Sequence, residues 1–271
     1  MLDNVARHNR ERWEALVRAG VRYSVPILDL NAESARHLVD PEGMMGACRG
    51  KDVLCLAGGG GQQSVAYALL GARVTVFDLV DLQLQRDRET AEHYGVELEV
   101  VQGDMRDLSA LEVRSFDIVH HAHSINFIPN PEVVFHEVSR VIRPGGLYRL
   151  TFTNPFIHGT WETDWDGSGY PVSREYADGE VVGVDLNWYI DDDDGGQVEV
   201  EGPTEFRHTL STLVNELTSR GFVILGLWED TSGDPEAEPG TWDHFKRFAA
   251  PWITLWCRFN PRAFIRHGTP Q

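Results

Sequence analysis

The sequence predicts an α/β fold in which helices cover both faces of a doubly wound, mostly parallel sheet of seven strands. Apolar, β-branched runs alternate with helical patterns between residues 51 and 153, which is typical of parallel βαβ units. Strands are expected at 51–57, 73–78, 97–101, 116–121, 147–153, 222–228 and 252–259. A chain of 271 residues can bury one such core, so we expect one domain.

Helices are expected between and around these strands, at 63–70, 82–94, 131–142 and 210–220. The third is followed by Pro144, which cannot continue a helix, and by two glycines that can supply the reversal into the next strand. A helix at 4–19 and a shorter one capped by Asn31 form an N-terminal helical cover, residues 1–48, ahead of the core at 49–155.

The segment from 154 to 203 is too long for a structureless connection in a compact domain. It is rich in Gly, Asp, Trp and Tyr, and the alternation at 180–190 and 197–201 predicts a hairpin around the sequence DDDDGG. We therefore expect an inserted lid or substrate-binding segment over 156–205, with 206–271 returning to complete the sheet.

Composition and charge disfavour several kinds of partner. The net charge of -18 opposes binding to phosphate backbones, so nucleic acid is not an expected substrate. No segment approaches the ~20 apolar residues of a membrane span. The charged N-terminus lacks the apolar stretch of a secretory signal, and three widely spaced cysteines suggest no disulfide framework, so the expected location is the cytoplasm.

Four consecutive glycines, Gly58 to Gly61, directly follow the first predicted strand. A strand, a glycine-rich turn and a helix start form a cavity of backbone amides at the carboxyl end of a parallel sheet, where doubly wound folds bind ligands. Asp78 ends the second strand, where a carboxylate can accept hydrogen bonds from ribose hydroxyls. The dinucleotide fingerprint GxGxxG is broken, because Gln63 or Ser64 takes the place of its third glycine. These features predict an adenosine-type cofactor.

In these residues the chain resembles the class I S-adenosylmethionine-dependent methyltransferases, especially their small-molecule branch. The matching stretches are VLCLAGGGGQQSVAYALLGARVTVFDLV, VVQGDMRDLS, FDIVHHAHSINFIPNPEVVFHEVSRVIRPGG and HTLSTLVNELTSRGFVI. They cover residues 50–155 well and 205–259 moderately, in the family's order. The resemblance implies a Rossmann-like methyltransferase fold, S-adenosyl-L-methionine as donor, S-adenosyl-L-homocysteine as product and a small-molecule acceptor.

The resemblance also implies the cofactor-binding residues. The family's glycine loop, which passes under the methionine moiety, falls on Ala57, Gly58, Gly59 and Gly61. Cys55 stands where the family usually has an acid and Ala57 where it has the first glycine, and Gln62 or Gln63 can supply the lost polar contact.

The adenosine end of the cofactor is placed by the same resemblance. Asp78 would hold the ribose hydroxyls, with Leu79 against the adenine. Asp104 would lie near the adenine amino group, with Met105 against the ring. Ala122, His123 and Ser124 would line the methyl-transfer face.

A sulfonium methyl group is already a strong electrophile, so positioning of the acceptor and exclusion of water are the main tasks of such a site. A base is needed only if the acceptor must lose a proton, and histidine suits that role near neutral pH. His120, His121, His123 and His208 are the candidates, of which His123 ranks first because it lies at the carboxyl end of the fourth strand. The alternative for each of them is a structural hydrogen bond.

Two further patterns allow more than one interpretation. The aromatic residues of the cover and the insertion can line a π-rich acceptor pocket or form the lid's own small core: Trp13, Tyr23, Trp161, Trp165, Tyr170, Tyr176, Trp188 and Tyr189. The run Asp191 to Asp194 suggests calcium, but an EF-hand loop starting there has Gly195 where its third ligand should be. We expect a solvated turn and no metal site.

Two other function classes remain open at this point. One is an NAD-dependent oxidoreductase or epimerase on a similar sheet, which the broken GxGxxG disfavours. The other is a non-catalytic protein that binds S-adenosylmethionine as a partner or regulatory subunit, which the departures at Cys55 and Ala57 permit.

Overall fold

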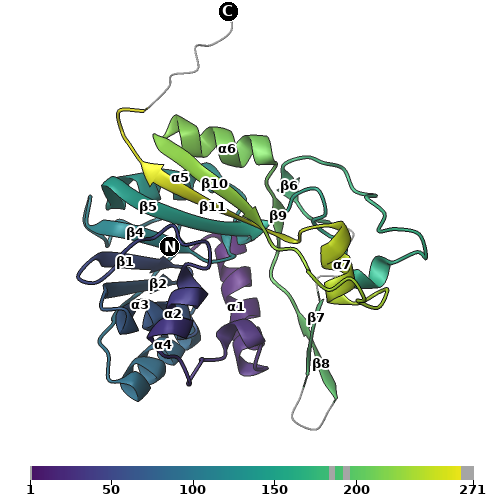
Figure 1. Cartoon of the computed structure of the whole chain (residues 1–271), viewed down its shortest axis with the longest axis horizontal. Helices are drawn as coiled ribbons and strands as arrows, with labels where there is room; N and C mark the ends of the chain where they lie inside the picture. Colours follow the sequence, from purple (N-terminus) through teal and green to yellow (C-terminus); the bar gives the residue numbers. More distant parts are fainter. Residues whose placement is uncertain (1, 183–186, 192–195, 264–271) are drawn as a thin grey trace, which may run out of the picture.

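The computed structural model describes residues 2–182, 187–191 and 196–263, and its centre is the predicted seven-stranded sheet (Figure 1). The strand order is β10-β11-β5-β4-β1-β2-β3. The bounds are Asp52–Leu56 (β1), Arg73–Asp78 (β2), Glu99–Gln102 (β3), Phe116–His121 (β4), Ile142–Thr153 (β5), Phe222–Glu229 (β10) and Trp252–Phe259 (β11). Neighbours from β3 to β5 are parallel, and β11 runs antiparallel between β5 and β10. The Rossmann-like methyltransferase fold is thereby confirmed.

Apolar residues of alternating orientation divide the core between the two faces of this sheet. In β1, Leu54 and Leu56 pack with α5 (Pro131–Val141) and α6 (Leu210–Ser219) on one face. Val53 and Cys55 pack on the other face with α2 (Ala32–Val39), α3 (Gln63–Leu69) and α4 (Asp81–Tyr94). Both faces of a parallel strand are buried in this way, which explains its continuous apolar sequence.

The N-terminal cover contains α1 (Asn4–Arg18), the short 3-10 helix η1 (Arg22–Ser24) and α2. Asp3 caps α1 by accepting a hydrogen bond from the amide of Ala6, and Asn31 caps α2 as the sequence predicts. Both helices begin where a side-chain oxygen is available to satisfy their first free amides.

The hairpin predicted at 180–190 and 197–201 is present in the described residues, although 183–186 lie outside them. Its strands are β7 (Asn187–Asp191) and β8 (Gln197–Glu201), which pair antiparallel. Gly179–Glu180, expected near the start of that hairpin, instead forms β6 and pairs with β9, Phe206–Arg207. The described part of the insertion also contains the 3-10 helix η3, Glu162–Asp164. Most of the acidic run, residues 192–194, lies outside the described residues.

The turn expected at Pro144-Gly145-Gly146 is part of β5. Helix α5 ends at Val141 and the strand begins at Ile142 without a separate connection. The register against β4 shifts here, and Gly145 has a φ of +86°, so the three residues form an irregular segment near the start of the strand. Proline and glycine are tolerated there because regular pairing begins only at Leu147.

Four short helices were not predicted from the sequence: η1 and η3, given above, and η2 and α7. The 3-10 helix η2, Ile125–Phe127, follows β4, and α7, Trp242–Phe248, precedes β11. Thr241 caps α7 by accepting a hydrogen bond from the amide of His244. Figure 1 shows α7 beside the insertion, away from the helices that cover the sheet.

Candidate active site

Two of the four glycines are required because helix α4 packs directly on the loop. A Cβ atom on Gly59 would lie 2.5 Å from the Cβ of Gln83. On Gly61, which has a φ of +72°, it would lie 2.2 Å from the hydroxyl of Thr90. By contrast, a Cβ on Gly58 would meet nothing closer than 3.6 Å. Close approach of a helix therefore explains the loss of side chains at Gly59 and Gly61.

A buried carboxylate of α4 holds the same loop. Asp87 accepts hydrogen bonds from the amides of Gly60 and Gly61, at 3.0 and 3.1 Å, and from the hydroxyl of Ser64. Burial raises the pKa of Asp87 to about 7, against the opposing effect of these three donors. The sequence did not identify Asp87 as a functional residue.

Asp78 lies at the carboxyl end of β2, as the sequence predicts, and faces the glycine loop. Its Oδ2 accepts a hydrogen bond from the amide of Gly59 at 3.1 Å, and its Oδ1 accepts one from the amide of Val80 at 2.8 Å. Burial raises the pKa of Asp78 to about 6. Each carboxylate oxygen can accept a second hydrogen bond, so the group can still receive hydroxyl donors from a ligand.

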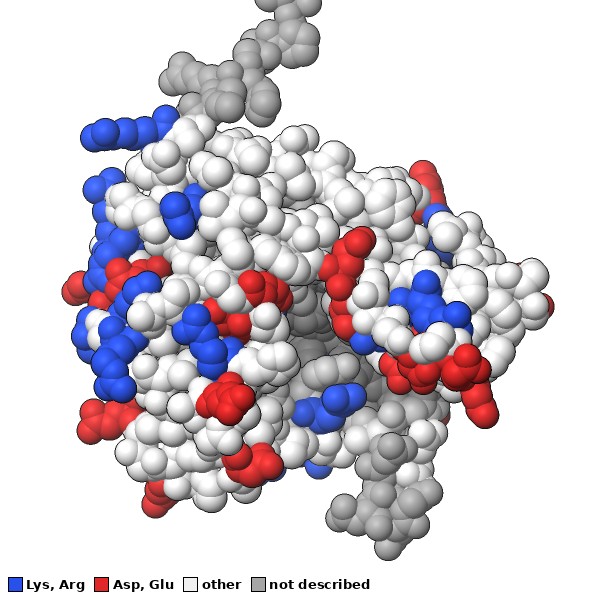
Figure 2. All heavy atoms as spheres, viewed as in Figure 1, with Lys and Arg blue, Asp and Glu red and all other residues white. Residues whose placement is uncertain are grey.

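A cavity of about 1630 Å³ opens at this edge of the sheet. Figure 2 shows the molecule hollowed between the body of the sheet and the region of α7. Its wall contains most of the predicted cofactor-binding residues: Ala57, Gly58, Gly59, Gln62, Asp78, Leu79, Asp104, Met105, Ala122 and His123. Gly61 and His208 are not among the residues that line it.

Gln62 and Asp104 line the cavity and also link the core to the N-terminal cover, Gln62 directly and Asp104 through Arg106. The side-chain amide of Gln62 donates to the carbonyls of Arg22 and Val25, at 3.0 and 2.7 Å. The carboxylate of Asp104 is paired with Arg106 at 2.6 Å, and Arg106 is also paired with Asp3. Both residues thus fasten the cover to the core beside the predicted cofactor position.

His123 is held inside the cavity wall in its neutral form. Its Nε2 lies 2.6 Å from the hydroxyl of Thr153, and its ring packs on Trp252 with centroids 4.3 Å apart. Burial lowers the pKa of His123 to about 3. A histidine with so low a pKa is a weak base at neutral pH, so the geometry supports a role in shaping the site more than in proton transfer.

The other candidate histidines make structural hydrogen bonds. His208 is buried, and its Nε2 lies 3.1 Å from the carbonyl oxygen of Ile125, while burial lowers its pKa. His121 lies between the hydroxyls of Tyr148 and Ser124, at 2.7 and 2.8 Å. His120 lines the cavity, but its Nδ1 is 3.0 Å from the hydroxyl of Tyr67.

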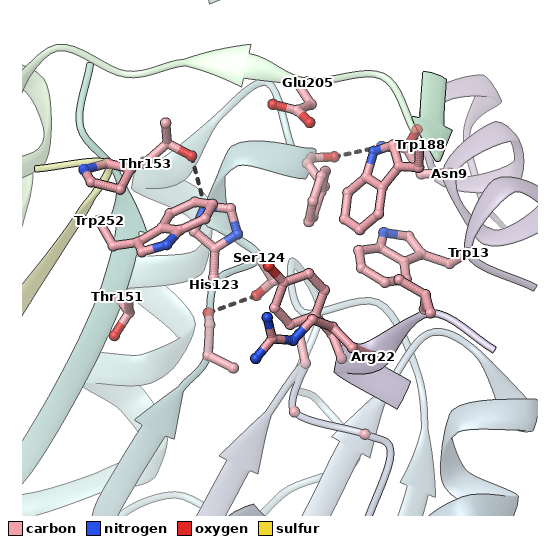
Figure 3. Close-up of a pocket in the computed structure, with 18 of the residues that line it drawn as sticks. Asn9, Trp13, Arg22, His123, Ser124, Thr151, Thr153, Trp188, Glu205 and Trp252 are labelled. Carbon is pink, nitrogen blue, oxygen red and sulfur yellow. Dashed lines mark hydrogen bonds between the residues drawn. The ribbon is translucent and has the colours of Figure 1, made fainter. Parts of the chain in front are cut away.

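Aromatic side chains from the cover and the insertion line the side of the cavity that faces away from the sheet. Trp13 packs edge-on against both Phe127 and Trp188, with centroids 5.3 and 5.5 Å apart, and Figure 3 shows Trp13 and Trp188 side by side. Asn9 secures this arrangement by donating to the carbonyls of Phe127 and Thr204. An acceptor in this part of the cavity would be surrounded by apolar, π-rich surface.

The aromatic residues of the cover and the insertion fall into two groups: those that line the cavity and those that pack within the insertion or on α7. The cavity-lining set is Trp13, Tyr23, Trp161, Trp188 and Tyr189. Trp165 and Tyr170 instead pack on Phe248 of α7, at 5.4 and 5.6 Å, and Tyr176 stacks on Phe156. Those three form small apolar contacts within the insertion and with α7.

Comparison with known proteins is consistent with this geometry and decides the family. A family profile described as a methyltransferase domain matches residues 54–150. The chain is 31% identical over 245 residues to the uncharacterized methyltransferase YbaJ of Bacillus subtilis, an alignment that covers 86% of this chain and 93% of that protein. The chain belongs to the class I S-adenosylmethionine-dependent methyltransferase family.

Two further similarities of this methyltransferase concern proteins whose names give a biosynthetic role or a bound small molecule. A ubiquinone biosynthesis O-methyltransferase of Salmonella arizonae is 33% identical over 101 residues, covering 37% of this chain and 42% of that protein. The structure of 1,6-didemethyltoxoflavin-N1-methyltransferase from Burkholderia thailandensis, with its acceptor and S-adenosylhomocysteine bound, superposes with a TM-score of 0.59 at 13% identity, covering 96% and 92% of the two chains. The latter similarity shows a shared fold.

The residues of this methyltransferase fit S-adenosylmethionine, the methyl donor of the family. The cradle at Gly59 and Asp78 admits no side chain, and Asp78 presents a buried carboxylate suited to ribose hydroxyls. Leu79 and Met105 supply apolar wall for a ring, and Gly103 has no room for a Cβ because Phe77 is 2.2 Å from where it would be. When bound, S-adenosylmethionine supplies an electrophilic methyl group.

Among the described residues, no group of three or more His, Cys, Asp or Glu side chains is placed to hold a metal ion. The described helices include none that is both long and apolar enough to cross a membrane.

Proposed function

We propose that this methyltransferase transfers the methyl group of S-adenosylmethionine to a small-molecule acceptor by in-line displacement. The observation that carries the proposal is one continuous cavity, whose wall includes the glycine loop and Asp78 at one end and Trp13, Trp188 and Trp252 at the other. A cavity roofed by its own insertion suits an acceptor that is enclosed, not one presented on a large macromolecular surface. The O-methyltransferase relative is compatible with this acceptor class.

Different residues along this cavity would bind the donor, form the methyl-transfer wall and position the acceptor. Asp78 and the cavity-facing part of the glycine loop, Ala57 to Gly59, bind the donor, while the amides of Gly59 to Gly61 are held by Asp78 and Asp87. Ala122, His123 and Ser124, which follow β4, form the wall where the methyl group is transferred. The cover and the insertion hold the acceptor in line and exclude water, which are the main requirements of transfer from a sulfonium. Because His123 is neutral and weakly basic, we assign it to orientation of the acceptor.

We also propose a cytoplasmic location, since all three cysteines, Cys48, Cys55 and Cys257, are free and buried.

The test is methyl transfer to a panel of small molecules that carry hydroxyl, amine, thiol or carbon nucleophiles. Formation of S-adenosylhomocysteine would be measured with each acceptor and without one. We expect acceptor-dependent product that is greatly reduced in Asp78→Asn. Tight binding of S-adenosylhomocysteine without product from any member of the panel would favour the non-catalytic binding protein. The family assignment disfavours the NAD-dependent alternative.

A further inference from the structure

Glu205 and His158 form a buried pair in the wall of the cavity. The Nε2 of His158 lies 2.7 Å from Oε2 of Glu205, and the two residues are 4% and 7% exposed. His158 follows β5 at the start of the insertion, and Glu205 precedes β9 at its end, so folding of the insertion brings them together. Neither residue takes part in the donor site described above.

The backbone on both sides of this pair is fixed. Arg207 donates to the carbonyl of His158 at 2.7 Å, and the amide of Val181 donates to the carbonyl of Glu205 at 2.8 Å. The Nδ1 of His158 is buried and has no hydrogen-bond partner among the described residues. An ionised carboxylate oxygen only accepts hydrogen bonds, so Nε2 of His158 carries a proton and donates it to Glu205.

The second carboxylate oxygen of Glu205 remains available to a ligand. In the described part of the chain, Oε1 makes no hydrogen bond. This oxygen is not itself buried, so it is accessible from the cavity. Figure 3 shows the carboxylate directed into the cavity, opposite the strand end that carries His123 and Ser124. The roof of the cavity therefore presents a strong hydrogen-bond acceptor toward the wall where methyl transfer would take place.

The surroundings of this oxygen define the kind of molecule that would reach it. Trp13 and Trp188 lie on one side of the cavity and Trp252 on the other, and Figure 3 shows Glu205 above the space between them. Indole rings favour a planar aromatic ligand, and a carboxylate favours a ligand group that carries an O–H or N–H.

We infer that Glu205 is a catalytic residue that binds the O–H or N–H of a planar aromatic acceptor and takes its proton, with His158 as a positioning residue. This inference rests on the proposed function. The acceptor oxygen or nitrogen forms a bond to the methyl carbon, and the electron pair of the breaking carbon–sulfur bond stays on sulfur. The acceptor's proton moves to Oε1 of Glu205 and is later released to water.

The first experiment measures binding by calorimetry to protein saturated with S-adenosylhomocysteine. The probes are catechol and 1,2-dimethoxybenzene, which has the same ring without a hydroxyl donor. The variants are Glu205→Gln, which keeps the side-chain shape, and Glu180→Gln, a matched loss of charge at an exposed position on β6. Wild type should prefer catechol by at least about 10-fold, the expected worth of a hydrogen bond to a charged group. Glu205→Gln should remove this preference, and Glu180→Gln should retain it.

Measurement of kcat distinguishes a role of Glu205 in proton transfer from a role in acceptor binding alone. With catechol as acceptor, Glu205→Gln should lower kcat by about 100-fold or more, the usual contribution of a general base, while the affinity for S-adenosylhomocysteine stays unchanged. Glu205→Asp, which keeps the charge but withdraws the oxygen, should also lower kcat. For His158, the amide of His158→Gln can still donate to Glu205, so we expect it to retain more kcat than His158→Ala.

Three results would overturn the inference: a wild type without preference for catechol, a preference that survives in Glu205→Gln, or normal kcat in that variant. A third probe, benzylammonium, tests for a cationic ligand. If Glu205→Gln weakens the binding of benzylammonium but leaves the preference for catechol unchanged, the carboxylate serves as an ion-pair partner and not as the base, and the inference is wrong. Failure of the proposed function is distinguishable, because it would appear as absent binding of S-adenosylhomocysteine in the wild type itself.

Discussion

The Oδ2 atom of Asp87 lies 3.0 Å from the backbone nitrogen of Gly60, so a side chain of helix α4 fixes the conformation of the loop that follows β1. The same carboxylate accepts the amide of Gly61. Where the family resemblance predicts an acid on the first strand, this chain has Cys55, and the buried carboxylate beside the glycines comes instead from α4, the helix that follows β2.

Replacement of Asp87 by alanine should therefore weaken both stability and cofactor binding. It would leave the buried amide of Gly61 unpaired, at a cost of about 1–3 kcal/mol, and would leave the amide of Gly60 with only its longer hydrogen bond, 3.3 Å, to the carbonyl of Gln83. Chemical denaturation and calorimetric titration with S-adenosylhomocysteine would measure the two effects. Glu92→Gln, an exposed change on the same helix, serves as the control and should alter neither. Unchanged binding in Asp87→Ala would show that the loop does not depend on this carboxylate.

The raised pKa of Asp87 also predicts a pH dependence of stability. Its pKa is about 7 in the folded protein, against about 3.9 for an ordinary aspartate in an unfolded chain. Between these values the folded state holds a proton that the unfolded state has released, so the contribution of Asp87 to stability is lost as the pH rises from about 4 to about 7. His121 and His123, with pKa values of about 3, have the opposite effect below about pH 6.5.

Comparison with Asp87→Asn isolates this contribution, because the histidines are the same in both proteins. The free energy of unfolding of the wild type, minus that of the variant, should fall by at most about 1.4 kcal/mol per pH unit over this range. Urea denaturation at several pH values measures it. A difference that stays constant, or that grows with pH, would mean that Asp87 is already ionised at low pH in the folded protein.

The glycines offer a matched pair of substitutions. Gly59→Ala places a methyl group 2.5 Å from the Cβ of Gln83 and should destabilise the fold, because α4 must move. Gly58→Ala places it at an ordinary 3.6 Å from Cys55 and should be tolerated. Thermal unfolding of the two variants tests this order, and equal melting temperatures would indicate that α4 does not pack on the loop as described.

His123 should remain neutral throughout the physiological range. With its pKa lowered to about 3 by burial, its ring resonances should not titrate between about pH 5 and pH 8, whereas an ordinary histidine titrates near about 6.5. Proton NMR of the wild type, assigned with His123→Asn, measures this directly. A midpoint near 6.5 for His123, an ordinary value, would restore it as a candidate base.

The sequence was sufficient where local pattern determines structure. The continuous apolar run of β1, the glycines after it and the aspartate at the end of β2 all belong to one βαβ unit, whose geometry follows from short-range rules. Asp78 and Gly59 were accordingly placed together, and they are joined by a hydrogen bond of 3.1 Å.

Contacts between segments that are distant in the sequence could not be predicted from these local patterns. Asp87 lies among charged residues in the sequence LQLQRDRET, a pattern typical of a solvated helix face, yet it is fully buried because α4 packs on the glycine loop. Glu205 and His158 are 47 residues apart and meet only through the fold of the insertion. The sequence placed Glu180 in the hairpin, whereas it pairs with Phe206 of β9, a partner far along the chain.

The central claim, that the glycine loop and Asp78 form the site of an S-adenosylmethionine-type ligand, is tested most directly by calorimetric titration with S-adenosylhomocysteine and, separately, with NAD. Wild type should bind the former and not the latter. Asp78→Asn should bind S-adenosylhomocysteine about 10-fold to 100-fold more weakly, because hydrogen bonds to a charged group are worth about 1.5–3 kcal/mol. Equal affinity in the wild type and in Asp78→Asn, or binding of NAD alone, would contradict the account.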